Sequence, residues 1–304
     1  MGVSMILDFY DFTLEFTYHD VSADDRYVEN FITDVRQKEH WTVDVCKFSY
    51  AASAEIFGER DCFTATIASF LASHGIFPVG LVGFYSNQVD QIKCKYQNMD
   101  IKLNLMQDTT LLQIIYPNDK KIRCYVCGSW DLWSFRSIYL SVLIYTDVRQ
   151  LLLHGAAIVV QEKGFLLLGT SGAGKTTASS FALSEGHQVL SDESPIILYQ
   201  DGELKLGGSP WSGSEKRLVG THDTVHLSAA LLLEKDTCDC LVRIDEITAK
   251  MKILTQQVYS TEKSDIVFTK KIIGIIRDIC EKLPYYTLHF TKSAKFIQVI
   301  SRQA

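Results

Sequence analysis

The stretch LLHGAAIVVQEKGFLLLGTSGAGKTTASSFALSEGHQVLSDE, residues 152–193, decides how the second half of this 304-residue chain folds. Its centre, GTSGAGKT (169–176), matches the pattern G-x-x-x-x-G-K-[ST]. We expect a strand over GFLLLG before the motif, and after it a helix from Lys175 to about Glu185 that stops at Gly186. A strand, a glycine-rich loop and a helix in this order predict a phosphate-binding loop.

The residues on either side extend this pattern. LLLHGAAIVVQ predicts one strand with His154 inside it, and EKG predicts a tight turn into GFLLLG. A link of three residues forces antiparallel pairing, so a β-hairpin should lead into the loop. After the helix, HQVLSDE predicts a strand that ends in two acidic residues.

The loop supplies the chemistry that a nucleotide needs. Glycines allow a tight turn that aims backbone N–H groups at a phosphate, and the start of the helix adds its positive end. The ammonium of Lys175 can reach the β- and γ-phosphates, and the hydroxyl of Thr176 can bind Mg²⁺. We therefore predict that this loop binds a nucleotide together with Mg²⁺.

Asp192 and Glu193 follow the apolar strand that returns from the helix. In phosphoryl transfer, one carboxylate near the loop commonly holds Mg²⁺ and another takes the proton of the attacking hydroxyl. Adjacent residues of a strand point to opposite faces, which suits a division of roles. The alternative is a solvated acidic pair at a strand end. His154 lies on the strand paired with the one that enters the loop, so it can approach the phosphates or be a core histidine.

The segment GGSPWSGSEKR after the next two predicted strands should form an exposed loop. Its Trp211, Lys216 and Arg217 can contact a phosphate or an acidic substrate. The alternative is a solvated turn with ordinary surface charges.

Composition argues against a nucleic-acid-binding, membrane-spanning or secreted protein. Net charge is −6 with 22% charged residues, which argues against a nucleic-acid partner. No apolar run is long enough to cross a bilayer, and MGVSMILDFYDF lacks the features of a secretory signal. The 8 cysteines are scattered, which is typical of a reducing compartment. We expect a soluble cytoplasmic protein without membrane contact.

CYVC (Cys124, Cys127) and CDC (Cys238, Cys240) could together bind zinc, or could be free thiols.

The chain is long enough for two units. Residues 1–130 mix short strands (DFTLEFTY, IKLNLMQ, TLLQIIY, KIRCYVCG) with a helix over Phe63–Gly75, so they predict an α+β N-terminal lobe that binds a substrate or partner. Helical spacing from about Leu132 to Tyr145 marks the boundary, and residues 131–304 form the second unit. DEITAKMKILTQQVY predicts a helix opened by Asp245, and LPYYTLHFTKS a late strand.

The segment from the His-Gly pair to the paired acids resembles the catalytic core of the HPr kinase/phosphorylase family, and GGSPWSG resembles a Pro-Trp segment of its HPr-kinase-like relatives. The resemblance covers roughly residues 130–215. It implies an α/β fold whose P-loop core has a mixed sheet like that of phosphoenolpyruvate carboxykinase, preceded by an N-terminal lobe. It also implies a homo-oligomer, since HPr kinases are commonly hexamers.

The resemblance assigns roles. It implies that ATP is held with Mg²⁺ by Gly169, Ser171, Gly172, Ala173, Gly174, Lys175, Thr176 and Thr177. Asp192 is implied as the general base for a serine hydroxyl, Glu193 stands where the family usually has a second Asp and assists the metal with Thr176, and His154 lies near the transferred phosphate. The long signature segment that follows the acids in the bifunctional enzymes is missing, which favours a kinase without phosphorolysis. Many relatives are encoded beside lasso-peptide genes, so the implied substrate is a serine of a peptide or small protein such as a lasso precursor.

Three other functions stay open. One is a small-molecule hydroxyl kinase on the same core, and another is a non-catalytic nucleotide-binding regulator. A carboxykinase is a more distant alternative, because its oxaloacetate-binding and metal-ligand residues are not found.

Overall fold

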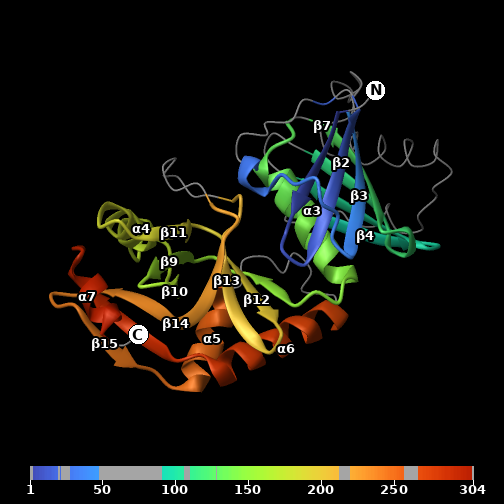
Figure 1. Cartoon of the computed structure of the whole chain (residues 1–304). Helices are drawn as coiled ribbons and strands as arrows, with labels where there is room; N and C mark the ends of the chain where they lie inside the picture. Colours follow the sequence, from blue (N-terminus) through green and yellow to red (C-terminus); the bar gives the residue numbers. More distant parts are fainter. Residues whose placement is uncertain are drawn as a thin grey trace, which may run out of the picture. The chain divides into compact units, whose positions relative to one another are not determined.

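The computed structural model describes residues 3–19, 21, 28–47, 91–105, 110–127, 129–211, 220–256 and 266–302 (Figure 1). The chain divides into two compact units. The first comprises Met1–Arg26 and Ile32–Thr146, and the second comprises Tyr27–Phe31 and Asp147–Ala304. Each unit has its own sheet, so each is described by itself. The boundary that the sequence suggests at residue 130 precedes the helix at 132–145, whereas the division in the structure follows it.

The first unit is a seven-stranded mixed sheet with the order β1-β2-β3-β7-β6-β5-β4. The β2-β3 and β3-β7 pairs are parallel and the other neighbours are antiparallel. Strands lie over DFTLEFTY and TLLQIIY and over the described parts of IKLNLMQ and KIRCYVCG, as predicted. Residues 121–126 alternate between at least partly exposed and buried positions, whereas residues 111–115 are all buried. The strands are β1 (Val3–Asp8), β2 (Phe12–His19), β3 (Glu39–Lys47), β4 (Gln91–Tyr96), β5 (Met99–Leu105), β6 (Thr110–Tyr116) and β7 (Lys121–Cys127), with a 3₁₀ turn at Pro117–Asp119.

Helix α3 (Leu132–Tyr145) runs along one face of this sheet (Figure 1). It begins where the carboxylate of Asp131 accepts a hydrogen bond from the backbone N–H of Ser134 at 3.0 Å. Aromatic rings join helix and sheet: Phe16 and Phe135 meet edge to face, with ring centroids 5.1 Å apart. The helix predicted from about Leu132 to Tyr145 is confirmed at both ends.

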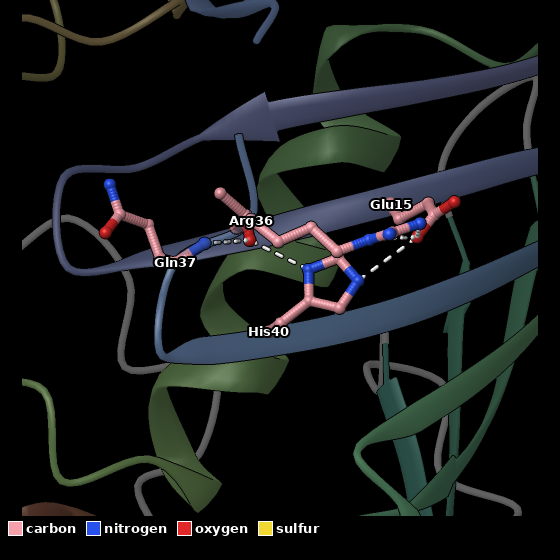
Figure 2. Close-up of polar contacts among 5 residues, drawn as sticks. Glu15, Arg36, Gln37 and His40 are labelled. Carbon is pink, nitrogen blue, oxygen red and sulfur yellow. Dashed lines mark hydrogen bonds and ion pairs between the residues drawn. The ribbon is translucent and has the colours of Figure 1, made fainter. Parts of the chain in front are cut away.

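A polar cluster connects strands β2 and β3 with the segment before β3 (Figure 2). His40 lies between two groups: its Nδ1 is 2.8 Å from Oγ1 of Thr13, and its Nε2 is 3.1 Å from Oε2 of Glu15. Arg36 donates to the same carboxylate oxygen at 2.7 Å, and the backbone N–H of Gln37 donates to Oγ1 of Thr13 at 3.2 Å. The Arg36 guanidinium and His40 together hold the pKa of Glu15 below its usual value against the opposing effect of burial. The cluster therefore fastens residues 36–37 to the sheet.

The second unit contains a nine-stranded mixed sheet. The main path runs β11-β9-β10-β14-β13-β12-β8, and β16 pairs with both β14 and β15. The strands are β8 (Gln150–Leu152), β9 (Ala156–Val160), β10 (Lys163–Leu168), β11 (Gln188–Ser191), β12 (Ile196–Gln200), β13 (Glu203–Gly207), β14 (Thr224–Lys235), β15 (Cys240–Arg243) and β16 (Tyr285–Phe290). The expected antiparallel hairpin is confirmed as β9-β10, whose turn residues Gln161 and Glu162 both have positive φ.

Three strands of this sheet are parallel neighbours: β10 pairs with β14, and β14 pairs with β16. The carboxyl ends of all three therefore meet at one edge, which is where open α/β sheets bind ligands. Leu168 at the end of β10 is level with Leu232, whereas Lys235 is level with Phe290. Strands β14 and β16 thus extend three residues, about 10 Å, beyond β10.

The helices of the second unit are α4 (Lys175–Ser184), α5 (Glu246–Gln256), α6 (Ile266–Lys282) and α7 (Lys295–Ser301), with a 3₁₀ turn at Glu29–Phe31. One buried cluster joins α4 and α7 to the strands, with Ala178 and Ala182 from α4 and Phe296 and Ile300 from α7. The helices α5 and α6 pack together (Figure 1).

Several predictions for this unit are confirmed. The helix over DEITAKMKILTQ begins at Asp245, whose carboxylate accepts from the backbone N–H of Thr248 at 2.9 Å, and LPYYTLHF contains β16. The helix predicted over Phe63–Gly75 lies outside the described residues. Within the described ranges, no helix is long and apolar enough to cross a membrane.

Candidate functional site

Residues 169–174 form a loop that joins the end of β10 to the start of α4, as the sequence predicts. The loop depends on glycine at two positions, because Gly172 and Gly174 have φ values of 77° and 110°. These values lie in a region that residues with a Cβ rarely adopt. Gly174 also has little room for a side chain, since a Cβ there would lie 3.2 Å from the ring of Phe290, a tighter contact than most Cβ atoms make. The loop therefore lies directly against the end of β16.

Lys175, the first residue of α4, folds back over this loop. Its Nζ donates to the carbonyl oxygen of Gly169 at 2.8 Å and approaches that of Thr170 at 3.4 Å. The residue is 8% exposed, and burial lowers the pKa of its ammonium while the nearby carboxylate of Glu193 opposes that change. A buried cation thus lies between the loop and an acidic residue.

Asp192 and Glu193 follow β11, but they do not continue it. The strand ends at Ser191, and the two acids lie in a bend, so the expected alternation across a strand is wrong. The bend is held by the hydroxyl of Ser191, which accepts from the backbone N–H of Ser194 at 3.1 Å. The two carboxylates still differ, because Asp192 is 1% exposed whereas the side chain of Glu193 is 32% exposed.

His154 does not lie inside a strand, contrary to the sequence-based expectation. The run LLLHGAAIVV is broken into β8 and β9, and His154 occupies the break. Backbone hydrogen bonds hold the chain on both sides of the break: Leu153 donates its N–H to the carbonyl of Pro195 at 3.1 Å, and Gly155 donates to that of Glu193 at 3.0 Å. The ring is held beside the acids, with Nδ1 3.2 Å from Oε1 of Glu193.

The structure thus brings three sequence-predicted residues together at one place. Lys175 and Glu193 interact electrostatically, and Glu193 contacts His154. The buried Asp192 is the neighbour of Glu193 in the chain. Of the remaining loop residues, Thr176 is half-buried in the first turn of α4, whereas Ser171 and Thr177 are exposed.

The donor set suits Mg²⁺ held together with a nucleotide. Carboxylate and hydroxyl oxygens are the ligands that Mg²⁺ prefers, and it is commonly bound by one or two carboxylates plus substrate phosphates. Thr176 and Glu193 offer such oxygens. Among the described residues there is no group of three or more His, Cys, Asp or Glu side chains that could hold a metal by themselves.

The segment GGSPWSGSEKR is not an exposed loop where the structure describes it. Residues 207–211 are buried, and Trp211 is 3% exposed. Its backbone N–H donates to the hydroxyl of Ser209 at 3.3 Å. Gly208 has no space for a Cβ, which would lie 2.0 Å from the carbonyl oxygen of Thr221. Trp211 is therefore a core residue, and Lys216 and Arg217 lie outside the described residues.

The residues that complete the edge of the sheet carry no functional motif in the sequence. Phe290 packs against Gly174, and the loops after β14 and β16 are joined by Asp239, which accepts hydrogen bonds from Thr291 at 2.9 Å and 2.6 Å. No local signal could reveal them, because the parallel pairing of β10, β14 and β16 joins segments that are far apart in sequence.

Comparison with known proteins gives one family and a distant structural neighbour. The neighbour is the HPr(Ser) kinase/phosphatase from Coxiella burnetii, with 13% identity, 50% of this chain and 95% of that chain covered, and a TM-score of 0.30, which is too low to establish a shared fold. No curated protein matches the chain. The family model described as "SynChlorMet cassette protein ScmC" matches residues 129–304, which include the whole loop, both acids and His154. The chain therefore belongs to the ScmC family.

Proposed function

We propose that this protein is an ATP-dependent kinase that transfers the γ-phosphate to a serine hydroxyl of a peptide or small protein. The observation that carries the proposal is the cluster of Lys175, Glu193 and His154 at the end of a glycine-rich loop, together with the buried Asp192 that precedes Glu193 in the chain. A loop that only capped a helix would need neither a buried ammonium nor two acids next to it.

In this proposal the loop and the positive end of α4 bind the phosphates. Lys175 leaves the carbonyl of Gly169 and neutralises charge on the β- and γ-phosphates, which is the main contribution a protein makes to phosphoryl transfer. Thr176 and Glu193 would hold Mg²⁺, which would supply positive charge beside the phosphates. His154 positions the carboxylate of Glu193 through the contact at 3.2 Å.

Asp192 acts as the general base. It accepts the proton of the serine hydroxyl while the serine oxygen bonds to the γ-phosphorus and the bond to the β–γ bridging oxygen breaks, so that ADP leaves. Its burial keeps water from competing for that proton. The buried Asp192 and the partly exposed Glu193 differ in environment, which supports assigning the role of general base to Asp192 and the role of metal ligand to Glu193.

The test uses the whole chain with Mg-ATP and serine-containing precursor peptides, followed by mass spectrometry. The wild type should add one phosphate to a serine. Asp192→Asn should retain stabilisation by Mg-ATP but lose transfer by about 10²–10⁴-fold, the usual contribution of a general base. Asp201→Asn is the matched control, because Asp201 lies in the β12–β13 turn with φ 52°, a conformation that Asn also tolerates.

Each failure has a defined meaning. Near-normal transfer by Asp192→Asn would show that Asp192 is not the base. ATP binding without phosphorylated peptide would favour a small-molecule acceptor, to be sought among hydroxyl-bearing metabolites, and no acceptor at all would favour a nucleotide-binding regulator. Absence of any stabilisation of the wild type by Mg-ATP would disprove the nucleotide site itself.

A further inference from the structure

A groove of about 630 Å³ lies in the second unit, between the loop after β14 and helix α7. Its volume is within the range of about 300–1,000 Å³ typical of small-ligand sites. One wall is formed by Thr237 and Cys238, and the other by the face of α7 that carries Lys295, Gln298 and Val299. The opposite face of α7 is buried in the core, so the groove has a fixed wall on that side.

The groove lies at the same edge of the sheet as the glycine-rich loop. Strands β14 and β16 are one and two positions from β10, which places their ends about 5 and 10 Å from it. The ring of Phe290, the last residue of β16, packs against Gly174 of the loop, and the next residue, Thr291, lines the groove. An extended nucleoside triphosphate can bridge this separation.

Hydrogen bonds hold the two loops that form the groove. Asp239 accepts from the N–H and the hydroxyl of Thr291, and that hydroxyl is 3.0 Å from Oγ of Ser293. In the same loop after β14, Asp236 accepts from the N–H of Thr237 at 2.6 Å and contacts His289 of β16 at 2.8 Å. Both loops are therefore organised before a ligand arrives, which reduces the entropic cost of binding.

The lining is chemically mixed. It offers the hydroxyls of Thr237 and Ser293, the amide of Gln298 and the apolar side chain of Val299. Hydroxyl and amide groups match the hydroxyls of a ribose and the polar edge of a base, and an apolar surface matches the face of a base. The cations of Lys295 and Arg302, also in the lining, could instead hold a free phosphate, so the experiment separates these two ligands.

We infer that this groove binds the nucleoside end of the nucleotide whose phosphates the 169–174 loop binds. The inference rests on the proposed function, because it assumes that the loop holds phosphates. It assigns residues after β14 and β16, which the motif does not contain, to recognition of the ribose and base.

The first test compares the binding of Mg-ADP with that of Mg-pyrophosphate by calorimetry. Val299→Trp fills the groove and should weaken Mg-ADP binding by about tenfold or more, while Mg-pyrophosphate binding stays unchanged. Ile273→Trp is the control, since Ile273 is 54% exposed on α6 and lies outside the groove. An unchanged affinity of Val299→Trp for Mg-ADP, or an equal loss for both ligands, overturns the inference and leaves the phosphate site standing.

The second test needs no substitution. Cys238 is exposed in the groove wall, so Mg-ADP should slow its alkylation by iodoacetamide, whereas Mg-pyrophosphate should not. Cys46 on β3 of the first unit is the internal control, and its alkylation should stay constant. Equal alkylation of Cys238 with and without bound Mg-ADP overturns the inference, as does protection by Mg-pyrophosphate alone, which would assign the groove to a free anion. If the wild type binds neither ligand, the proposed function and this inference both fail.

Discussion

The Nζ of Lys175 lies 2.8 Å from the carbonyl oxygen of Gly169, so the lysine bonds to the loop that precedes its own helix. The ammonium is satisfied locally although it is almost fully buried. A bound phosphate would replace a neutral carbonyl by an anion, and a hydrogen bond to an ion is roughly twice as strong as one between neutral groups. The contact therefore marks the position from which the lysine would move to the nucleotide.

Replacement of this lysine should abolish the effect of the nucleotide on stability. At a ligand concentration of about 100 Kd, Mg-ATP should stabilise the wild type by about 2.7 kcal/mol, which raises Tm by roughly 5–10 °C. Lys175→Met should reduce this shift to near zero, because the β- and γ-phosphates lose their cation. Differential scanning fluorimetry with and without Mg-ATP measures the effect. Lys270→Met, at an exposed position of α6, should retain the full shift; a full shift in Lys175→Met would contradict the role given to Lys175.

Two glycines in the second unit should respond to alanine in opposite directions. Gly174→Ala should destabilise the protein by about 1–3 kcal/mol and weaken nucleotide binding, because φ is 110° and the new Cβ would meet the ring of Phe290. Gly274→Ala in α6 has open space around it and should stabilise by roughly 0.5–1 kcal/mol. Urea denaturation gives both values, and equal effects at the two sites would disprove the strain assigned to Gly174.

The contribution of the polar cluster in the first unit to stability should depend on the hydroxyl of Thr13. Thr13→Val should cost about 1–3 kcal/mol, because it removes the acceptor of the Gln37 N–H and the group that contacts His40 in a fully buried position. Thr17→Val is the matched control on the same face of β2, where the structure shows no side-chain hydrogen bond within the described part of the chain. We expect it to be neutral in urea denaturation, and a neutral Thr13→Val would mean that the cluster is not stabilising.

Lys271 on α6 should make the free energy of unfolding vary with pH in the alkaline range. Burial lowers the pKa of this lysine from 10.5 to about 8, and Asp147 partly opposes the change. Between those two values the unfolded chain binds more protons than the folded one, so the free energy of unfolding should rise with pH in this range. Lys271→Met should raise stability near neutral pH and remove most of that rise, whereas Lys270→Met should keep it. Urea midpoints at about pH 7 and about pH 9.5 test this, and an unchanged pH dependence in Lys271→Met would rule out Lys271 as its source.

The sequence predicted those parts of the fold that have strong local signals. The β10–loop–α4 segment carries glycines at positive φ and a helix that ends at Gly186, and α3 has its cap residue Asp131. The approach of Glu193 to Lys175 and His154 follows from the same short segment, because the chain returns within a few residues to the strand beside the loop. Local pattern was therefore sufficient to assemble most of the candidate site.

The errors lie where the periodicity of apolar residues does not reveal how the chain packs. The apolar run around His154 looks continuous in sequence, yet the strand is interrupted at His154, and the residues on either side of it bond to Glu193 and Pro195. Trp211 lies in a polar, glycine-rich segment, yet it is buried. Strand β14 and helix α6 were not predicted at all, although β14 is the strand that joins β10 to β16.

The second unit also includes Tyr27–Phe31, a short segment that the chain supplies long before the rest of that unit. Asn30 donates to the carbonyl of Gly220, 190 residues later, and the ring of Phe31 meets that of His222 with centroids 5.2 Å apart. Because synthesis proceeds from the N-terminus, residues 28–31 leave the ribosome well before these partners exist. The second unit therefore makes these two contacts only with a segment from the N-terminal part of the chain. A fragment that begins at Asp147 lacks Asn30 and Phe31, and adding a peptide of residues 27–31 should partly restore its stability.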